Sequence, residues 1–138
     1  MVAWARIVAE FLAPGGYLAL ADAHPFVYVF DSANVTPDGM PGWYAPYLAR
    51  AASLEDDPRD YADPAARLRN SRTWQWLHPV SDILTALLQA GSRIDRFREH
   101  DSCVWRVFDN LVERGPEDYA WPDRPWLPLS FSLRATKP

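Results

Sequence analysis

The fold depends on one stretch of the chain, Phe11-Leu-Ala-Pro-Gly-Gly-Tyr-Leu-Ala-Leu-Ala-Asp-Ala-His-Pro25. A tight turn is predicted in it, because Pro14 presets φ at the second position of a turn and Gly15 can take the positive φ of a type II turn at the third. Tyr17 to Ala21 then carries apolar side chains at every position, which is typical of a strand buried on both faces of a parallel sheet. Ligands bind outside the carboxyl ends of strands in open α/β sheets. We therefore expect a ligand near Asp22 to Pro25, where this strand ends.

The composition indicates one globular domain. A chain of 138 residues is long enough for one domain with a real core, and we expect residues 1–138 to form it. Hydrophobic residues make up 49% of the chain and charged residues 23%, as in ordinary soluble proteins. The formal net charge of −4 and the lack of a basic patch argue against nucleic acid as a partner.

Cysteine content and hydropathy predict a cytoplasmic protein. Cys103 is the only cysteine, so no internal disulfide can form, and a reducing compartment is the natural inference. Arg6 and Glu10 interrupt the apolar pattern of the first residues, so these do not resemble a signal peptide. No apolar run approaches the roughly eighteen residues of a membrane span, and we expect no membrane partner.

Hydrophobic spacing predicts two helices. Val2 to Leu12 carries Trp4, Ile7, Val8, Phe11 and Leu12 at spacings of three and four, as an amphipathic helix does. A second apolar stripe runs from Val80 to Leu88. Pro79 suits the first position of that helix, and Gly91 suits the residue just past its end.

Two further strands are predicted in the second half of the chain. Arg93 to His100 is polar, with only Ile94 and Phe97 as large apolar residues, and it suits the edge of a sheet. Leu129 to Ala135 alternates apolar with polar residues, which predicts a strand with two different faces.

The remaining stretches have weaker patterns. Phe26 to Phe30 is β-prone and could extend the first strand or form a small hairpin. Residues 31–72 are rich in turn residues, although Leu48 to Leu54 could form one or two helical turns. Long insertions of this kind are uncommon unless they are functional, so we interpret 31–72 as a lid or insertion. Thr73 to Trp76 alternates like a short strand, and residues 101–127 predict an irregular loop.

Four segments, taken in order, resemble one protein family. They are Phe11-Leu-Ala-Pro-Gly-Gly-Tyr-Leu-Ala-Leu20, Trp76-Leu-His-Pro-Val-Ser-Asp-Ile-Leu84, Leu87-Leu-Gln-Ala-Gly91 with Phe97-Arg-Glu-His100, and Leu127-Pro-Leu-Ser-Phe-Ser-Leu-Arg-Ala-Thr-Lys-Pro138. Together they resemble the carboxyl-terminal half of a class I S-adenosylmethionine-dependent methyltransferase, of the small-molecule kind called methyltransferase type 11. The resemblance covers nearly the whole chain.

The resemblance implies an α/β fold, namely part of a Rossmann-like methyltransferase fold with a mixed sheet. The family's sheet has seven strands, and the last one runs antiparallel between the fifth and the sixth. In this chain Tyr17 to Ala21 would be the fifth strand, Arg93 to Glu99 the sixth, and Leu129 to Ala135 the seventh. The carboxyl-terminal strand is therefore expected in the middle of the sheet.

The sequence departs from the family at the cofactor site. In the family, S-adenosylmethionine is held by a glycine-rich turn after the first strand, where the lack of side chains lets the backbone approach the ligand. Here Gly15 and Gly16 precede a strand, and the other glycines are isolated. We therefore expect the amino-terminal strands and the cofactor half to be missing. No cofactor-binding residue is assigned, and S-adenosylmethionine is not expected to bind this chain alone.

The missing strands would leave Tyr17 to Ala21 as an exposed apolar edge. Such an edge is a template for pairing with another chain. Two outcomes are open. The chain is a fragment of a longer reading frame and is stable only with its missing half, or it associates through residues 17–21, either with a second copy in a homodimer or with a separate amino-terminal half.

The resemblance also implies a pocket for the methyl acceptor in this half of the fold. Methyl transfer is an in-line displacement that depends on orientation, a dry pocket and sometimes a general base. His24, which follows the first strand, is the candidate catalytic base or orienter. A histidine that caps a loop at a strand end is an equally good interpretation.

Aromatic and histidine side chains are candidates for binding the acceptor. These candidates are Phe26, Tyr28, Trp76, His78 and Trp105. Aromatic residues suit pocket walls and cores alike, so core packing is the alternative for them, and a helix N-cap is the alternative for His78. Cys103 lacks an activating neighbour and is interpreted as an inert thiol. The histidines and Cys103 do not have metal-ligand spacing, so no metal site is expected.

The sequence leaves three functions open. The chain could be the carboxyl-terminal portion of a methyltransferase that acts on a small molecule and is inactive alone, because the half that binds S-adenosylmethionine is absent. It could instead be a non-catalytic binding or assembly module that retains an aromatic pocket. A divergent enzyme with a donor site of its own is the third possibility.

Overall fold

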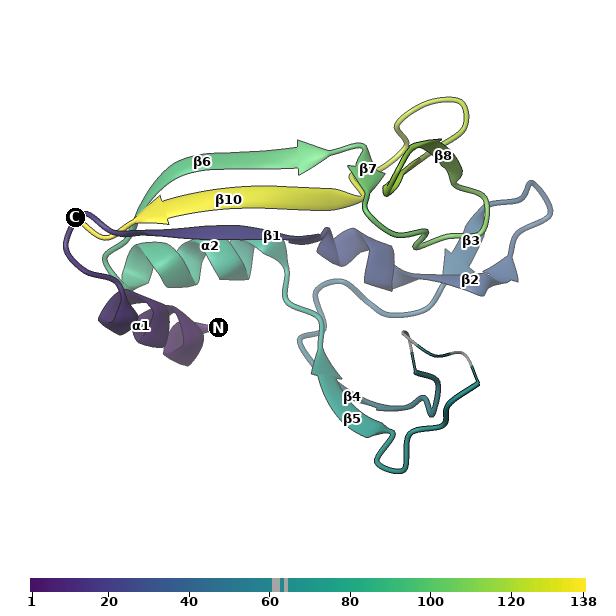
Figure 1. The fold of residues 1–138 in the computed structure, drawn as a ribbon, viewed down its shortest axis with the longest axis horizontal. Helices are drawn as coiled ribbons and strands as arrows, with labels where there is room; N and C mark the ends of the chain where they lie inside the picture. The colour runs from purple at the N-terminus through teal and green to yellow at the C-terminus, as the bar shows by residue number, and fades with distance from the viewer. Residues whose placement is uncertain (61–62, 64) are drawn as a thin grey trace.

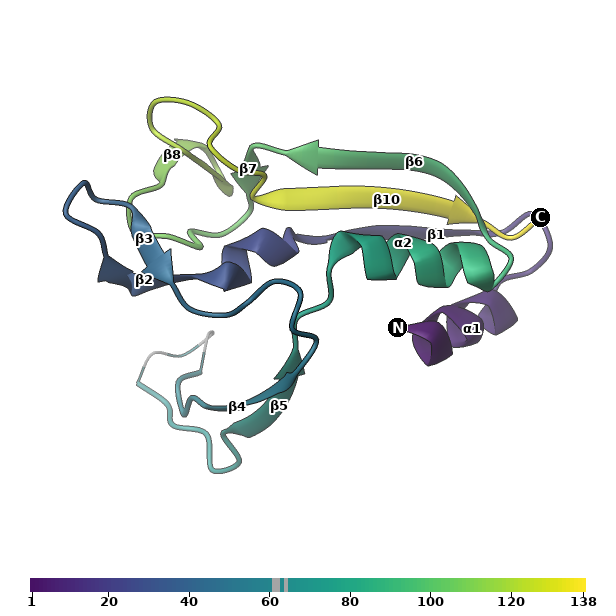
Figure 2. The ribbon, with the colours of Figure 1, turned by 180° about the vertical axis from the view of Figure 1, so that it is seen from behind.

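The computed structural model of the chain describes residues 1–60, 63 and 65–138, and it combines two helices with short strands (Figure 1). Residues 61, 62 and 64, which belong to the predicted lid, lie outside the described residues. The largest strands form a three-stranded sheet with both helices on one of its faces (Figures 1 and 2). The smaller sheets, two of two strands and one of three, lie toward one end of this sheet.

The central sheet has the strand order β1 (Tyr17–Ala23), β10 (Ser130–Thr136) and β6 (Arg93–His100). β10 runs antiparallel to both neighbours, so β1 and β6 are parallel to each other. The expectation that the carboxyl-terminal strand lies antiparallel in the middle is confirmed. β6 is an edge strand, as its polar sequence predicted.

The turn before β1 has the predicted geometry. The Gly16 N–H donates to the Ala13 carbonyl over 2.8 Å, and Gly15 has φ +78°, so Pro14 and Gly15 occupy the middle of a type II turn. The chain is also tied to its carboxyl end here. The Lys137 ammonium donates to the carbonyls of Ala9 and Leu12, which are free at the end of the first helix.

Both helices form where the apolar spacing predicted them. α1 spans Val2–Phe11, and α2 spans Val80–Gln89. Pro79 is the N-cap of α2 rather than its first helical residue, and Gly91 follows the helix with φ +84°, a conformation that costs glycine little. Helices and sheet share one buried core, which consists of Ala5, Ile83, Ala86, Leu87, Phe131, Leu133 and Ala135.

The prediction that Tyr17 to Ala21 is buried on both faces is wrong. Leu18 and Leu20 pack against the core, but Tyr17 is 52% exposed and the alternate alanines are exposed too. The reason is that α1 and α2 lie on the same face of the sheet and leave the other face open. The apolar stripe predicted for α1 is also only partly buried, because Ile7 and Phe11 are 52% and 86% exposed.

The stretch after β1 is less irregular than the sequence indicated. Phe26 to Phe30 does not extend β1, because the 3₁₀ helix η1 (Pro25–Val29) turns the chain away from the sheet. β2 (Phe30–Val35) then pairs with β3 (Pro41–Trp43).

A hairpin arm follows within the predicted lid. β4 (Ala52–Asp56) pairs with β5 (Arg72–Trp76), so the helical turns considered for Leu48 to Leu54 are wrong and the short strand predicted at Thr73 to Trp76 is confirmed. The arm is anchored to α2 at its base. The Val80 N–H donates to the Tyr47 hydroxyl over 3.0 Å, and the Arg50 guanidinium binds the Asp82 carboxylate with contacts of 2.6 and 2.9 Å.

Residues 101–127, expected as an irregular loop, contain a small three-stranded sheet. Its order is β7 (Ser102–Cys103), β9 (Asp118–Ala120) and β8 (Val112–Gly115). Hydrophobic alternation is too short in these strands to be recognised, and a second core of buried side chains holds them. This core consists of Ala23, Val27, Cys103, Phe108, Leu111, Trp121 and Leu129.

In the part of the chain that the structure describes, neither helix has the length and apolar character needed to cross a bilayer.

Candidate functional site

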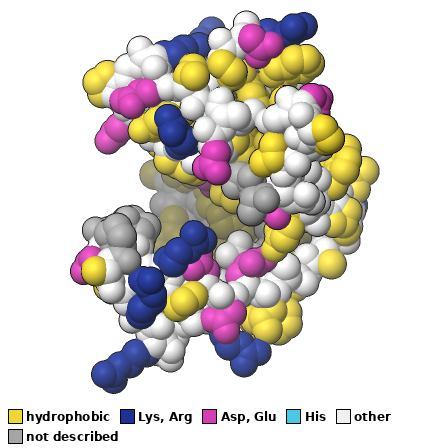
Figure 3. All heavy atoms as spheres, turned by 90° about the vertical axis from the view of Figure 1, so that its right-hand side faces the viewer, with side chains coloured by type: hydrophobic (Ala, Val, Ile, Leu, Met, Phe, Trp, Pro, Cys, Tyr) yellow, Lys and Arg dark blue, Asp and Glu magenta, His cyan; other side chains and the backbone are white. Residues whose placement is uncertain are grey.

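The candidate site lies where β1 and β6 end. Both strands run in the same direction, so residues 24–79 and 101–129 leave the sheet at the same end (Figure 1). Figure 3 shows that the molecule is hollowed on this side, with hydrophobic side chains on the floor of the hollow. A ligand site at the carboxyl ends of parallel strands is the arrangement expected of an open α/β sheet.

A cavity of about 470 Å³, called here the central cavity, opens between the start of α1, the end of β1 and the end of β5. Its size falls within the range of small-molecule sites. The residues that line it include Trp4, Asp22, Tyr28, Trp76, His78 and Ile83. Three candidates from the sequence, Tyr28, Trp76 and His78, therefore lie around one cavity.

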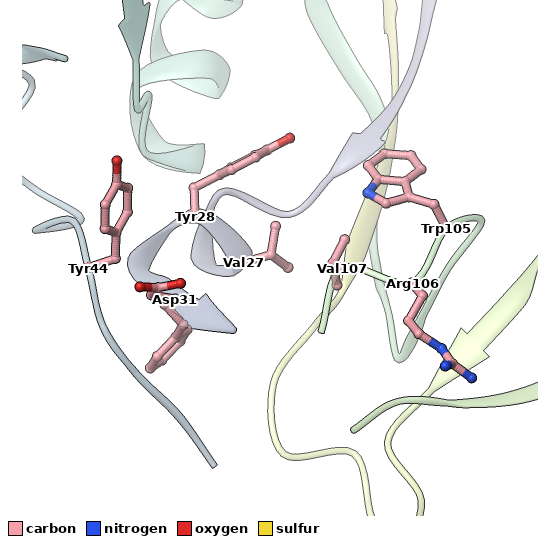
Figure 4. A pocket seen from close by; sticks show the side chains of 8 residues that line it. Val27, Tyr28, Asp31, Tyr44, Trp105, Arg106 and Val107 are labelled. Carbon is pink, nitrogen blue, oxygen red and sulfur yellow. The ribbon is translucent and has the colours of Figure 1, made fainter. Parts of the chain in front are cut away.

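A second space of about 520 Å³, called here the outer groove, lies on the other side of Tyr28. Figure 4 shows Tyr28, Asp31 and Tyr44 on one side of the groove and Trp105 and Val107 on the other. Trp105, the remaining tryptophan candidate, thus lines the groove rather than the central cavity.

Tyr28 separates these spaces because η1 holds it between them. Its side chain is half exposed and lines both the central cavity and the outer groove. Burial raises the pKa of the Tyr28 hydroxyl, and the negative charge of Asp22 adds to this effect. The hydroxyl is therefore neutral at pH 7 and can donate a hydrogen bond.

His24 is buried behind the cavity and caps η1. Only 1% of it is exposed, and its Nδ1 accepts a hydrogen bond from the Phe26 N–H over 3.1 Å. Nδ1 is therefore unprotonated in the neutral ring, and the proton lies on Nε2, 3.2 Å from Glu99 Oε1. That approach lacks hydrogen-bond alignment, and it is an ion pair only when the ring is protonated. Burial lowers the pKa of His24, whereas Glu99 opposes the shift.

Phe26 is held in place by contacts with two neighbouring rings. Its ring packs between those of His24 and Tyr47 in tilted contacts, with centroid distances of 4.7 and 4.6 Å. Phe26 lines neither the central cavity nor the outer groove. The candidates His24 and Phe26 therefore support the wall that carries Tyr28.

His78 does not occupy the N-cap position that was its alternative interpretation, because Pro79 takes that position. It faces the central cavity instead. Burial lowers the pKa of His78, the amino group of Met1 contributes to this, and Asp82 opposes it. The imidazole is therefore neutral at pH 7 and able to accept a proton.

Two lining residues were not among the site residues predicted from the sequence. Trp4 was assigned to the apolar stripe of α1, yet it lies over the end of β1. Asp22 is exposed at the end of β1 and also lines the cavity, and an acidic residue at the end of an apolar strand was the signal that could have identified it.

The described residues contain no group of three or more His, Cys, Asp or Glu side chains that could hold a metal ion. Cys103 is buried, and this burial raises the pKa of its thiol, in keeping with the interpretation as an inert residue.

Comparison with known proteins identifies the fold. The chain matches no protein-family model and no curated protein sequence. Its structure aligns over its whole length with 55% of a protein assigned as an S-adenosylmethionine-dependent methyltransferase from Listeria monocytogenes, with a TM-score of 0.60 and 15% identity. The chain has half of a methyltransferase fold.

A second solved structure gives the same result for the fold. An S-adenosylmethionine-dependent methyltransferase from Mesorhizobium loti aligns with 98% of the chain and 54% of its own length, with a TM-score of 0.52 and 17% identity. The chain therefore spans about half the length of the methyltransferases that it resembles, and the resemblance noted in the sequence is confirmed at the level of the fold.

Proposed function

We propose that this chain is the acceptor-binding half of an S-adenosylmethionine-dependent methyltransferase that acts on a small molecule. The observation that carries the proposal is the alignment of the whole chain with about half of two such enzymes. The central cavity supports it, because a cavity of small-molecule size lies at the carboxyl ends of the parallel strands.

The proposed roles follow from position. Tyr28, Trp76 and His78 bind the acceptor in the central cavity, and Trp105 contacts it where it extends into the outer groove. The neutral imidazole of His78 can take a proton from an acceptor as a methyl group arrives. His24 acts as an orienter, because it caps the helix that carries Tyr28, and Phe26 packs against it.

The methyl donor is proposed to bind only when further chain completes the site. The lack of a glycine-rich turn after a strand supports this. The completing chain would be a separate amino-terminal half, or a second copy in a homodimer, paired along the free edge of β1. A cytoplasmic location remains a prediction.

The first test is a calorimetric titration of the purified chain with S-adenosylhomocysteine, with its oligomeric state determined in parallel. We expect no binding by the chain alone. Micromolar binding by a monomer would contradict the incomplete donor site and would favour an enzyme with a donor site of its own.

A second experiment tests the transferase itself. The product of the coding sequence upstream is co-expressed with this chain, and transfer of a radioactive methyl group from S-adenosylmethionine is measured over a panel of small molecules. Transfer by the complex, but by neither part alone, is expected. A complex that binds S-adenosylhomocysteine and transfers nothing would contradict the proposal.

A non-catalytic binding module is the second candidate function. It is favoured by one observation, namely that aromatic side chains line the central cavity, where they can bind a ligand without a methyl donor. Ligand binding in this cavity without methyl transfer by any completed complex would identify this function.

A further inference from the structure

Charged groups lie at two places around the central cavity. Asp22 is the only Asp, Glu, Lys or Arg among the described residues that line it. Met1 lines the cavity too, and its positive amino group acts on His78 and Asp82 and lowers the pKa of both. The negative charge of Asp22 lies at the end of β1, and the positive charge lies at the start of α1.

Asp22 has capacity for a further contact. Its Oδ1 accepts the Ala23 N–H over 2.7 Å, and this is the only hydrogen bond of its carboxylate among the described residues. An ionised carboxylate can accept about four hydrogen bonds, so most of its capacity is free. The neighbouring Tyr28 hydroxyl is neutral and cannot neutralise this charge.

The aromatic residues of the cavity differ from those of the core. Core rings stack in pairs, such as Phe108 with Trp121 at 5.5 Å. Within the described part of the chain, Trp4, Tyr28 and Trp76 form no ring–ring contact and no cation–π contact, although they border the same cavity. Tyr28 and Trp76 are also about half exposed, so part of each ring is open to a ligand, whereas Trp4 packs in part against the main core.

A carboxylate beside unstacked aromatic rings is the chemistry that recognises an organic cation. The carboxylate pairs with the charge, and the negative faces of the rings attract it. We propose that the central cavity binds a protonated amine on an apolar body of aromatic-ring size, with the ammonium on Asp22 and the body against Trp4 and Trp76. This inference names the class of acceptor by the ammonium through which the cavity holds it, since a protonated nitrogen has no lone pair and cannot itself accept the methyl group. It rests on the proposed function for its biological meaning, although the binding can be tested without it.

The test uses three probes of one shape and different charge. Phenethylamine, 2-phenylethanol and phenylacetate are titrated into the full chain, and binding is followed by NMR through the indole N–H signals of the tryptophans. We expect the amine to bind about tenfold more tightly than the alcohol, a difference of about 1.4 kcal/mol. The acid is expected to bind weakest, and the signals of Trp4 and Trp76 should move while that of Trp126 stays fixed.

Two variants locate the charge. Asp22→Asn should bring the affinity for the amine down to that for the alcohol. Asp109→Asn, the matched control, removes an exposed carboxylate outside the central cavity and should leave all three affinities unchanged.

Equal binding of the three probes, or preference for the acid, would overturn the proposal without touching the proposed function. Absence of binding by every probe would overturn it too. The comparison of probes on the unaltered chain decides the matter even if Asp22→Asn fails to fold. Failure of methyl transfer in the completed complex would instead contradict the proposed function and leave amine binding intact.

Discussion

Leu87 and Leu88 are neighbours in α2 with opposite environments. Leu87 is fully buried in the core, whereas Leu88 is 56% exposed. Leu87→Ala should lower the free energy of unfolding by about 2–5 kcal/mol, because it removes buried methyl groups and leaves a cavity. Leu88→Ala, the matched control, should change it by less than about 0.5 kcal/mol. Urea denaturation measures both, and similar losses would mean that α2 does not pack on the sheet as described.

His24 gives the protein a predictable response to acid. Its folded-state pKa lies below the ordinary value of 6.5, so the unfolded chain takes up the proton more readily. Stability should therefore be complete above pH 6.5 and should fall as the pH drops below it. One such histidine contributes a slope of at most about 1.4 kcal/mol per pH unit.

His24→Asn isolates this contribution, because asparagine can still cap η1 but does not titrate. Urea denaturation between pH 7.5 and 5 should give a smaller slope for the variant than for the unaltered chain. His78 keeps part of the slope, since its pKa is lowered as well. Identical slopes would show that His24 is not buried as a neutral ring.

Among the elements, α2 depends on a residue far away in the sequence. Its N-cap, Pro79, provides no side-chain hydrogen bond, and Tyr47 supplies one to the Val80 N–H. Tyr47→Phe should cost about 1 kcal/mol, because this partly buried N–H loses its acceptor.

Tyr44→Phe is the control for this prediction. The Tyr44 hydroxyl also forms a hydrogen bond, to Glu55, but on the exposed surface of the arm. Thermal unfolding should show a larger loss for Tyr47→Phe than for Tyr44→Phe. Equal losses would mean that the arm is not anchored through α2.

For the molecule as a whole, the free edge of β1 is the feature that governs association. The His24 N–H points toward β10 and donates to the carbonyl of Leu129, the residue just before that strand. The Ala23 N–H points away from β10 and donates to the Asp22 carboxylate. Because N–H groups alternate along an antiparallel strand, that of Ala21 faces the free edge. Proline is tolerated at such an edge position, where it removes only the outward donor.

Ala21→Pro should therefore keep the fold and weaken association with a second copy or with an amino-terminal half. Ala21→Val keeps the N–H group and should associate as the unaltered chain does. Sedimentation velocity over a concentration series measures this. Unchanged association of a folded Ala21→Pro variant would move the interface away from β1.

Local chemistry was sufficient to predict several parts of the fold. The turn at Pro14 and Gly15 and the end of α2 at Gly91 follow from backbone preferences that a few residues set. The alternating face of β10 follows from its period of two, and its place in the middle of the sheet was implied by the family resemblance.

Other parts depend on contacts between distant segments. The small strands of 101–127 are too short for a pattern and are held by a shared core. The exposed face of β1 reflects the placement of both helices on one side of the sheet.

The candidate site was predictable as a location and only in part as a set of residues. The carboxyl end of an apolar strand indicated the place, and Tyr28, Trp76 and His78 line one cavity there. The sequence could not show that Asp22 and Trp4 line the same cavity, because they come from different elements, β1 and α1, which only the packed structure brings together. Backbone preferences act between neighbouring residues, whereas a cavity is made by side chains that only the packed chain brings together.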